Sequence, residues 1–303
     1  NAQHLVDLAE EGHASLVVAQ LEPGDVEENH AATRLAVHLA EDPSSLGIRI
    51  SGAGAGRVNL YAEHAGIVQI DLDAIATFNS INPMITIATV PQFHRVDADG
   101  MIATIKVISY AVPEDDVRQA EAAMAGAMRV LAAQYASAPL LETQVGRQVP
   151  SEKGRNALSG RLYRFGVMLS ERVVVSHEED AIKRALAEAP GEVIFLLTAS
   201  ATSDEQDVGP AALRGAGGSV TSFGMPVDPG NLLFFGDLDA KPVIGLPGCA
   251  RSPALNGADW VMERLLCGVK LNPQDIAGMG VGGLLKEIPT RPRPRALKVE
   301  PAP

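Results

Sequence analysis

The sequence predicts an α/β protein whose second half is a three-layer αβα domain with a mostly parallel sheet, preceded by a smaller α+β domain. Short apolar runs in that half alternate with helical patterns, which indicates βαβ units. Glycine and proline separate the runs, as expected for short loops. Aromatic residues are only 4% of the 303 residues, which favours close packing of helices on a sheet over an aromatic-rich β-sandwich.

The first half, residues 1–138, is expected to be compact α+β. Asp25 is expected to cap a helix, because apolar residues follow it at helical spacing. A long helix is expected over Glu114–Gln134, where acidic residues follow a proline. The expected strands are rich in β-branched residues or enter a glycine-rich turn: Ile48–Ala55, Met84–Val90 and Met101–Tyr110. No pattern in this half indicates a particular chemistry.

The domain expected at residues 139–268 alternates strands with helices. Its third strand, Val193–Thr198, begins with an uninterrupted apolar run, as a parallel strand covered on both faces should. The other expected strands are Leu140–Val145, Val167–Val175, Ser219–Phe223, Leu232–Phe235 and Val243–Leu246, and the helices are Asn156–Phe165, Glu178–Ala189 and Asp207–Gly215. Ligands bind beyond the carboxyl ends of such strands, so the loops after Thr198, Phe223 and Leu246 are the candidate site.

Composition argues against several classes of protein. The formal net charge of −12 disfavours a nucleic-acid surface, which needs clustered Lys and Arg. The two cysteines, Cys249 and Cys267, disfavour a disulfide framework and favour the reducing cytoplasm. No apolar run approaches the roughly 20 residues that a membrane-spanning helix needs, so no membrane association is expected.

Both ends of the chain suggest a piece of a longer product. The first residue is Asn rather than Met, and no signal-peptide core follows it. Residues 269–303 are expected to be a C-terminal extension that ends in a proline-rich basic linker, Pro289–Pro303. A further domain is therefore expected beyond the linker.

The loop after the third expected strand is rich in small residues. Thr198 and Ser200 stand at the strand end, where small side chains let backbone N–H groups approach a ligand, and the next helix offers its positive N-terminus to an anion. Asp204 is a further candidate ligand contact. Asp207 stands at the helix start, where it is either an N-cap or a magnesium ligand.

Two further loops hold glycine and proline between strands. The first is either a rigid turn or a ligand contact. The second adds a hydroxyl and a guanidinium, which are groups that a phosphate site uses. Cys249 in the second loop is either an activated thiol or a small loop filler. The candidate ligand contacts of the two loops are Asp228, Pro229, Gly230, Asn231, Gly245, Pro247, Gly248, Arg251 and Ser252.

Two basic residues are candidate ligand contacts, whereas the histidines are not. Lys153 and Arg155 follow the first strand of the second half, so they are either cationic ligand contacts at the same sheet edge or solvated loop residues. The seven histidines show no zinc-binding spacing such as HExxH, which favours scattered surface positions.

Taken together, the loops resemble the molybdopterin-binding domain family of molybdenum-cofactor biosynthesis. The family carries a Thr-Gly-Gly-type loop followed by Asp-Val-x-Pro, and Thr198, Asp207, Val208 and Pro210 stand at matching places. The similarity covers roughly Pro139–Pro253. More loosely, the chain resembles the N-terminal part of bacterial fusions in which a nucleotidyltransferase of the molybdenum-cofactor cytidylyltransferase type follows such a domain.

The molybdenum-insertase branch of that family supplies two more matches. Val227–Asn231 resembles its Lys-Pro-Gly-Lys-Pro-type turn, and Gly245-Leu-Pro-Gly248 with Ser252 resembles its Gly-Leu-Pro-Gly-Asn-Pro-x-Ser motif. The chain departs from the family at two places: Ala199 and Ser200 replace glycines, and Asp228 and Asn231 replace lysines. These departures favour cofactor handover over efficient molybdenum insertion.

The resemblance implies an αβα molybdopterin-binding fold that binds molybdopterin or its nucleotide form and assists molybdenum insertion or delivery to a fused or separate transferase. It also implies a catalytic Asp207 that holds Mg²⁺ against the ligand phosphate, with hydrogen bonds from Thr198, Ser200, Gly248 and Ser252. A homo-oligomer is expected. The alternatives are a non-catalytic interaction module and a nucleotide pyrophosphatase of the competence-associated family that shares the fold.

Overall fold

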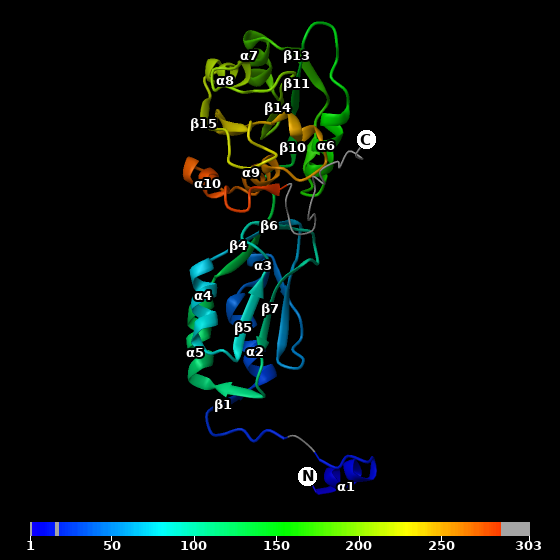
Figure 1. The fold of residues 1–303 in the computed structure, drawn as a ribbon, viewed down its shortest axis with the longest axis vertical. Helices are drawn as coiled ribbons and strands as arrows, with labels where there is room; N and C mark the ends of the chain where they lie inside the picture. Colours follow the sequence, from blue (N-terminus) through cyan, green and yellow to red (C-terminus); the bar gives the residue numbers. More distant parts are fainter. Residues whose placement is uncertain (1, 16–17, 286–303) are drawn as a thin grey trace, which may run out of the picture. The chain divides into compact units, whose positions relative to one another are not determined.

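A computed structural model describes residues 2–15 and 18–285, and these residues form an α/β protein as predicted (Figure 1). The chain divides into two compact units. The first comprises residues 1–63, 69–92 and 99–129, and the second comprises residues 64–68, 93–98 and those from 130 onward. The expected linker at Pro289–Pro303 lies outside the described residues. None of the described helices combines the length and apolar character that crossing a membrane requires.

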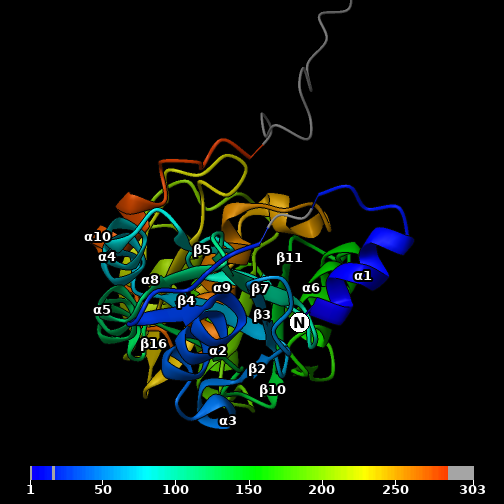
Figure 2. The ribbon, with the colours of Figure 1, turned by 90° about the horizontal axis from the view of Figure 1, so that it is seen from below.

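The first unit is built on a four-stranded antiparallel sheet in the order β2-β3-β7-β5, with a separate two-stranded pair, β1-β8. Helix α2 packs against β3 and β7, and α4 lies beside α5 (Figure 2). Its strands are β1 Asp25–Glu27, β2 Ile48–Ile50, β3 Arg57–Ala62, β5 Ile85–Thr89, β7 Met101–Val107 and β8 Ala111–Pro113; its helices are α1 Ala2–Glu10, α2 Glu28–Leu39, α3 Pro43–Leu46, α4 Leu72–Ile81 and α5 Glu114–Met124.

Two predictions for the first unit are corrected. Asp25 begins β1 instead of capping a helix, and the N-cap of α2 is Glu27, whose carboxylate accepts hydrogen bonds from the next two free backbone N–H groups. The long helix over Glu114–Gln134 is wrong, because α5 ends at Met124 and the chain turns at Gly126, with φ at 68°.

The chain after that turn becomes strand β9, Met128–Leu131, in a three-stranded sheet with β4 Gly66–Ile70 and β6 His94–Val96, in the order β6-β4-β9. Met128 and Val130 are buried while the residues between and after them are more exposed. This alternation has the two-residue period of a strand. The segment is too short for its sequence to distinguish this period from that of the helix that precedes it.

The second unit has a six-stranded sheet in the order β13-β11-β14-β17-β16-β15. The first four strands are parallel to one another, and β16 pairs antiparallel with both β17 and β15. A short parallel pair, β10-β12, lies apart from it. The strands are β10 Ser137–Ala138, β11 Leu140–Gln144, β12 Met168–Leu169, β13 Val173–Ser176, β14 Ile194–Leu197, β15 Ser219–Phe223, β16 Phe234–Leu238 and β17 Lys241–Gly245. The helices are α6 Lys153–Tyr163, α7 Glu179–Glu188, α8 Val208–Gly215, η1 Gly248–Arg251, α9 Gly257–Leu266 and α10 Pro273–Gly278.

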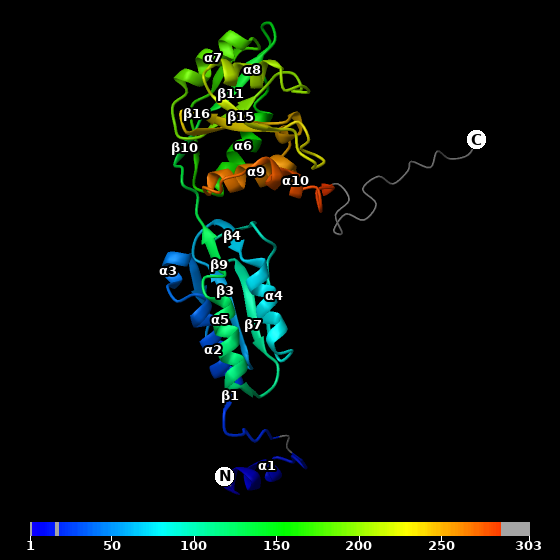
Figure 3. The ribbon, with the colours of Figure 1, turned by 90° about the vertical axis from the view of Figure 1, so that its left-hand side faces the viewer.

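Helices cover both faces of this sheet, which gives the three layers that the sequence predicts (Figure 3). On one face, Leu158 of α6 and Val261 of α9 pack with Phe195 of β14 in one apolar cluster. On the other face, Ile182 of α7 and Leu213 of α8 join a second cluster. Each such buried side chain contributes about 1.5–3 kcal/mol, so the two clusters hold β14 rigidly at the centre of the unit.

The strand expected over Val167–Val175 is two strands with different partners. β12 pairs with β10, whereas β13 pairs with β11, and the backbone N–H of Ser170 bonds to Ala138 between them. Arg172 in this connection donates through Nε to the buried carboxylate of Glu142, 2.8 Å away. The residues between β12 and β13 therefore carry the chain from the β10-β12 pair to the six-stranded sheet. The β-branched residues of the sequence predicted strand structure but not this change of partner.

Candidate functional site

The parallel strands β13, β11, β14 and β17 end at one edge of the sheet, and the loops after them carry the sequence-predicted site. Thr198 stabilises the first loop from within, and its role as a ligand contact stays a prediction. It is 5% exposed, its hydroxyl donates to the carbonyl of Ser200 at 2.8 Å, and it lies 3.2 Å from the hydroxyl of Thr202. Ser200 itself is exposed.

The backbone of this loop holds unused hydrogen-bond donors. Across the described residues, the backbone N–H groups of Ser200, Ala201 and Thr202 donate to no protein acceptor, and Thr202 itself is buried. Unused N–H groups next to an exposed hydroxyl suit an anion. Contact of this loop with a ligand stays a prediction.

Asp207 occupies the N-cap position of α8, but its carboxylate does not cap that helix. Its Oδ2 turns back and accepts the backbone N–H groups of Ser203 at 2.7 Å and Asp204 at 3.1 Å. Asp204 in turn accepts the N–H of Gln206 at 2.7 Å. Both carboxylates thus shape the loop and place negative charge beside the start of α8.

The residues around Asp207 do not form a ready-made magnesium site. Within residues 2–15 and 18–285, no three His, Cys, Asp or Glu side chains gather in a way that could hold a metal ion. One oxygen of Asp207 is already shared by two N–H donors. The magnesium role expected for Asp207 stays a prediction.

The loop after β17 brings a cation to the Thr198 loop. Arg251 is half-buried and donates through Nη2 to the carbonyl of Thr198 at 2.7 Å. Lys153, by contrast, is the exposed first residue of α6, and Arg155 donates to the carbonyl of Ser170. Of the predicted cations, Arg251 is the one whose contact with the loop is direct.

The glycines and small residues of the loop after β17 have different roles. Gly245 is buried, and an added Cβ there would overlap the ring of Phe234, so packing accounts for this glycine. Ser252 accepts the N–H of Ala254 through its hydroxyl at 3.3 Å. Burial raises the pKa of the Cys249 thiol, and the Asp259 and Asp228 carboxylates raise it further, which favours the loop-filler interpretation over an activated thiol.

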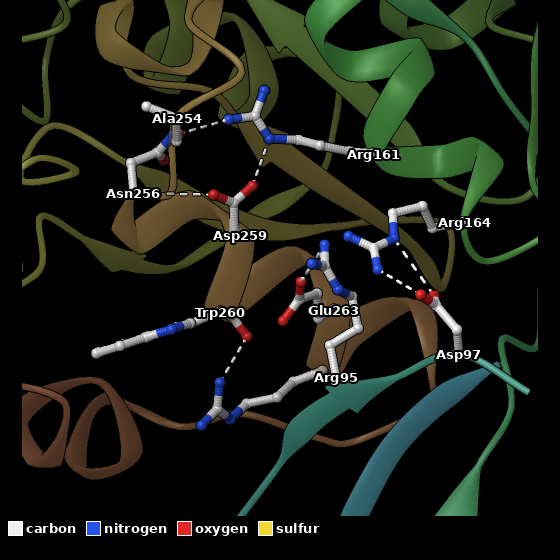
Figure 4. A network of polar contacts seen from close by, with 10 residues as sticks. Arg95, Asp97, Arg161, Arg164, Ala254, Asn256, Asp259, Trp260 and Glu263 are labelled. Atoms are coloured by element: carbon white, nitrogen blue, oxygen red, sulfur yellow. Dashed lines mark hydrogen bonds and ion pairs between the residues drawn. The ribbon is translucent and has the colours of Figure 1, made fainter. Parts of the chain in front are cut away.

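Arg161 of α6 is hydrogen-bonded to this same loop (Figure 4). Its guanidinium donates to the carbonyls of Ala250 at 2.9 Å and Ser252 at 2.8 Å and pairs with the carboxylate of Asp259. Asp259 also completes the capping box at the start of α9 with Asn256. The loop that carries Arg251 is therefore fixed to two helices.

The loop between β15 and β16 forms a turn held against α9. Asp228 and Pro229 are joined by a cis peptide bond, and Gly257 donates its N–H to the carbonyl of Pro229 at 2.8 Å. Gly230 has φ of 143°, and an added Cβ would lie 2.7 Å from the nitrogen of Gly257. The Asn231 amide donates to the carbonyl of Met225 at 3.3 Å. These contacts support the rigid-turn interpretation, and ligand contact by this turn stays a prediction.

Two site residues escaped the sequence prediction. Thr143, near the end of β11, and His177, directly after β13, lie next to Ser200 and bond to each other at 2.9 Å. His177 is half-buried and lies between two hydroxyls, which gives this histidine specific partners. Both residues are polar and stand where parallel strands end, and that position was the signal available in the sequence.

Comparisons with known proteins give little beyond this geometry. No protein-family model matches the chain, and no curated protein matches it either. A solved structure of a molybdopterin biosynthesis MoeA protein from Pyrococcus horikoshii is 14% identical, with a TM-score of 0.36 over 80% of each chain. A second such structure is 11% identical, with a TM-score of 0.26 over 80% of this chain and 79% of the other. Similarity at this level says nothing about a ligand.

Proposed function

We propose that the second unit binds a phosphorylated pterin, molybdopterin or its nucleotide form, through its phosphate at the loop after β14. The observation that carries the proposal is the row of unused N–H donors at Ser200, Ala201 and Thr202 beside the exposed Ser200 hydroxyl. A phosphate accepts hydrogen bonds at every oxygen, so it can satisfy several of these donors together. The sequence motifs support a pterin as the ligand, whereas the unused N–H donors support a phosphate group on it.

The loop carries charge of both signs. The positive end of the α8 dipole and the Arg251 guanidinium, which donates to the carbonyl of Thr198, favour an anion, whereas the Asp204 and Asp207 carboxylates oppose it. Because the net charge of the whole chain is −12, attraction of the phosphate has to come from this local arrangement. We infer that Arg251 strengthens phosphate binding through its charge without necessarily touching the ligand.

We further propose that the unit hands over cofactor rather than inserting molybdenum efficiently. Asp228 and Asn231 stand where the insertase motif has lysines. A carboxylate near a molybdate dianion repels it by about 1 kcal/mol or more near a surface, and Asn231 supplies no compensating charge. Binding of the pterin phosphate by backbone N–H groups is less affected.

Isothermal titration with molybdopterin tests the binding proposal, with the dephosphorylated pterin as the comparison ligand. We expect micromolar or tighter binding that needs the phosphate. Ser200→Ala should weaken binding about tenfold, the order of one hydrogen bond to a charged group. Ser203→Ala, an exposed serine of the same loop, is the matched control and should change affinity less than twofold. Absence of heat with molybdopterin contradicts the proposal.

Molybdenum incorporation into molybdopterin tests the handover proposal. The double variant Asp228→Lys, Asn231→Lys should raise molybdate-dependent turnover above that of the parent at equal protein concentration. If the parent already works at the rate of a lysine-bearing insertase, the handover proposal is wrong and the protein is a full enzyme.

A further inference from the structure

A chain of three side chains crosses three neighbouring strand ends at the candidate site. The Thr143 hydroxyl of β11 lies 2.9 Å from Nδ1 of His177, and Nε2 of the same ring lies 2.8 Å from the Ser200 hydroxyl. The backbone N–H of His177 also bonds to the carbonyl of Gln144 at 2.9 Å, which fixes the ring at the end of β13. The strand order β13-β11-β14 places these groups side by side.

The direction of each hydrogen bond follows from counting donors. Ala199 donates its N–H to the Thr143 oxygen at 2.6 Å, so that oxygen is an acceptor there. Thr143 is fully buried, and its own hydrogen needs an acceptor. Among the described residues, the partners of the Thr143 hydroxyl are the N–H of Ala199, which donates, and Nδ1 of His177, which can accept its hydrogen. In the neutral ring, Nδ1 therefore accepts and Nε2 carries the hydrogen.

This tautomer determines what Ser200 can do. Nε2–H of His177 donates to the Ser200 oxygen, so the hydrogen of the Ser200 hydroxyl stays available at the exposed side of the loop. Together with the unused N–H groups beside it, the loop then offers donors to a ligand. A group that only accepts hydrogen bonds, such as a phosphate, suits this row of donors.

We propose that Thr143 and His177 are positioning residues that fix the Ser200 hydroxyl as a hydrogen-bond donor to a ligand oxyanion. The ligand in this inference, a phosphate monoester, rests on the proposed function, whereas the proton arrangement does not. The arrangement also separates Ser200 from a serine nucleophile. A nucleophile needs the lone pair of a neighbouring base to take its proton, and Nε2 of His177 has no lone pair to offer.

Nitrogen-15 NMR of the histidine rings reads the tautomer directly. With the full chain, we expect the signal of the neutral His177 ring to show hydrogen on Nε2. The spectrum of His177→Gln identifies this signal among the seven histidines. Thr143→Ser keeps the hydroxyl and should keep the tautomer, and Thr143→Val should release it. Hydrogen on Nδ1 in the parent protein overturns the inference, even if the valine variant fails to fold.

Binding of inorganic phosphate tests the positioning role. We expect His177→Leu to weaken binding about fivefold, because the Ser200 hydroxyl then rotates freely, and His177→Gln to stay within about twofold, because its amide N–H can replace Nε2–H. Ser200→Ala should cost about tenfold in the parent and clearly less in His177→Leu. Equal costs of Ser200→Ala in both backgrounds overturn the positioning role.

Labelling with a fluorophosphonate reagent, which reacts with activated serines, tests whether Ser200 is a nucleophile. We expect no adduct at Ser200 by mass spectrometry, and an adduct overturns the inference in favour of a nucleophile. If the parent binds neither phosphate nor molybdopterin while the ring shows hydrogen on Nε2, the proposed function fails and the proton arrangement stands. If the parent binds phosphate and the ring shows hydrogen on Nδ1, the inference alone fails.

Discussion

Arg161 of α6 and Asp259 of α9 form an ion pair whose side chains are only 10% and 7% exposed, although the residues stand 98 positions apart. The same guanidinium bonds to the carbonyls of Ala250 and Ser252, and the second oxygen of Asp259 accepts the N–H of Asn256 at 2.8 Å. One nearly buried pair therefore fixes the loop that brings Arg251 to the candidate site.

Arg161→Leu should lower the free energy of unfolding by about 3–5 kcal/mol, because it leaves the Asp259 carboxylate buried without its cation. Urea unfolding measures the change. The double variant Arg161→Leu, Asp259→Asn is the control, since it removes the stranded charge while the Asn oxygen can still accept the N–H of Asn256. It should recover at least 1 kcal/mol of the loss. No recovery would mean that the lost carbonyl contacts, rather than the buried charge, dominate.

Glu263 of α9 gives the protein a specific pH dependence. Burial is the main cause that raises the pKa of its carboxyl group to about 7; Arg95, with Nη1 3.5 Å from Oε1, opposes this shift, and Asp259 supports it (Figure 4). Its ordinary pKa is 4.5. Between pH 4.5 and 7 the folded protein therefore keeps a proton that the unfolded chain has released. Stability falls as pH rises through this window, by at most about 3 kcal/mol.

Urea unfolding at pH 5 and pH 8 tests this prediction. Glu263→Gln should lose less stability between the two pH values than the parent protein does, since it has no carboxyl group to ionise. Glu188→Gln, at an exposed position of α7, should follow the parent. An identical pH dependence in Glu263→Gln and the parent would show that Glu263 titrates normally.

Gly245, the last residue of β17, and Gly248, the first residue of η1, should respond differently to alanine. An added Cβ at Gly245 overlaps the buried ring of Phe234, so Gly245→Ala should cost about 1–3 kcal/mol of stability. At Gly248 the nearest atom is Nη1 of Arg251 at 3.6 Å, and Gly248→Ala should cost about 0.5 kcal/mol or less. Thermal unfolding compares the two variants. Similar costs would refute the packing explanation of Gly245.

Asp207 should act first through the shape of its loop. Asn can accept the same two backbone N–H groups of Ser203 and Asp204, so Asp207→Asn should bind phosphate within about twofold of the parent without magnesium, while Asp207→Ala should bind several-fold more weakly. Titration of phosphate with and without Mg²⁺ checks both variants. If Mg²⁺ tightens binding by the parent but not by Asp207→Asn, the carboxylate holds the metal as the sequence motif implies.

The sequence by itself determined the layered second unit and the position of its main loop. Val193–Thr198 predicted a central buried strand and contains β14, and Asp207 marks the start of α8. These features are local: a continuous apolar run and a loop of small residues have the same meaning whatever lies beside them. The place of this loop at the end of β14 could therefore be predicted before any contact was known.

Only the tertiary structure decided which side chains meet at that loop. His177 reaches Ser200 because the sheet order is β13-β11-β14, and strand order depends on packing between distant segments rather than on local pattern. The same reason explains Met128–Leu131, which became a strand only because β4 was there to pair with it. Spatial neighbours also gave Gly245 a packing requirement that the sequence did not show, since its partner Phe234 lies on another strand.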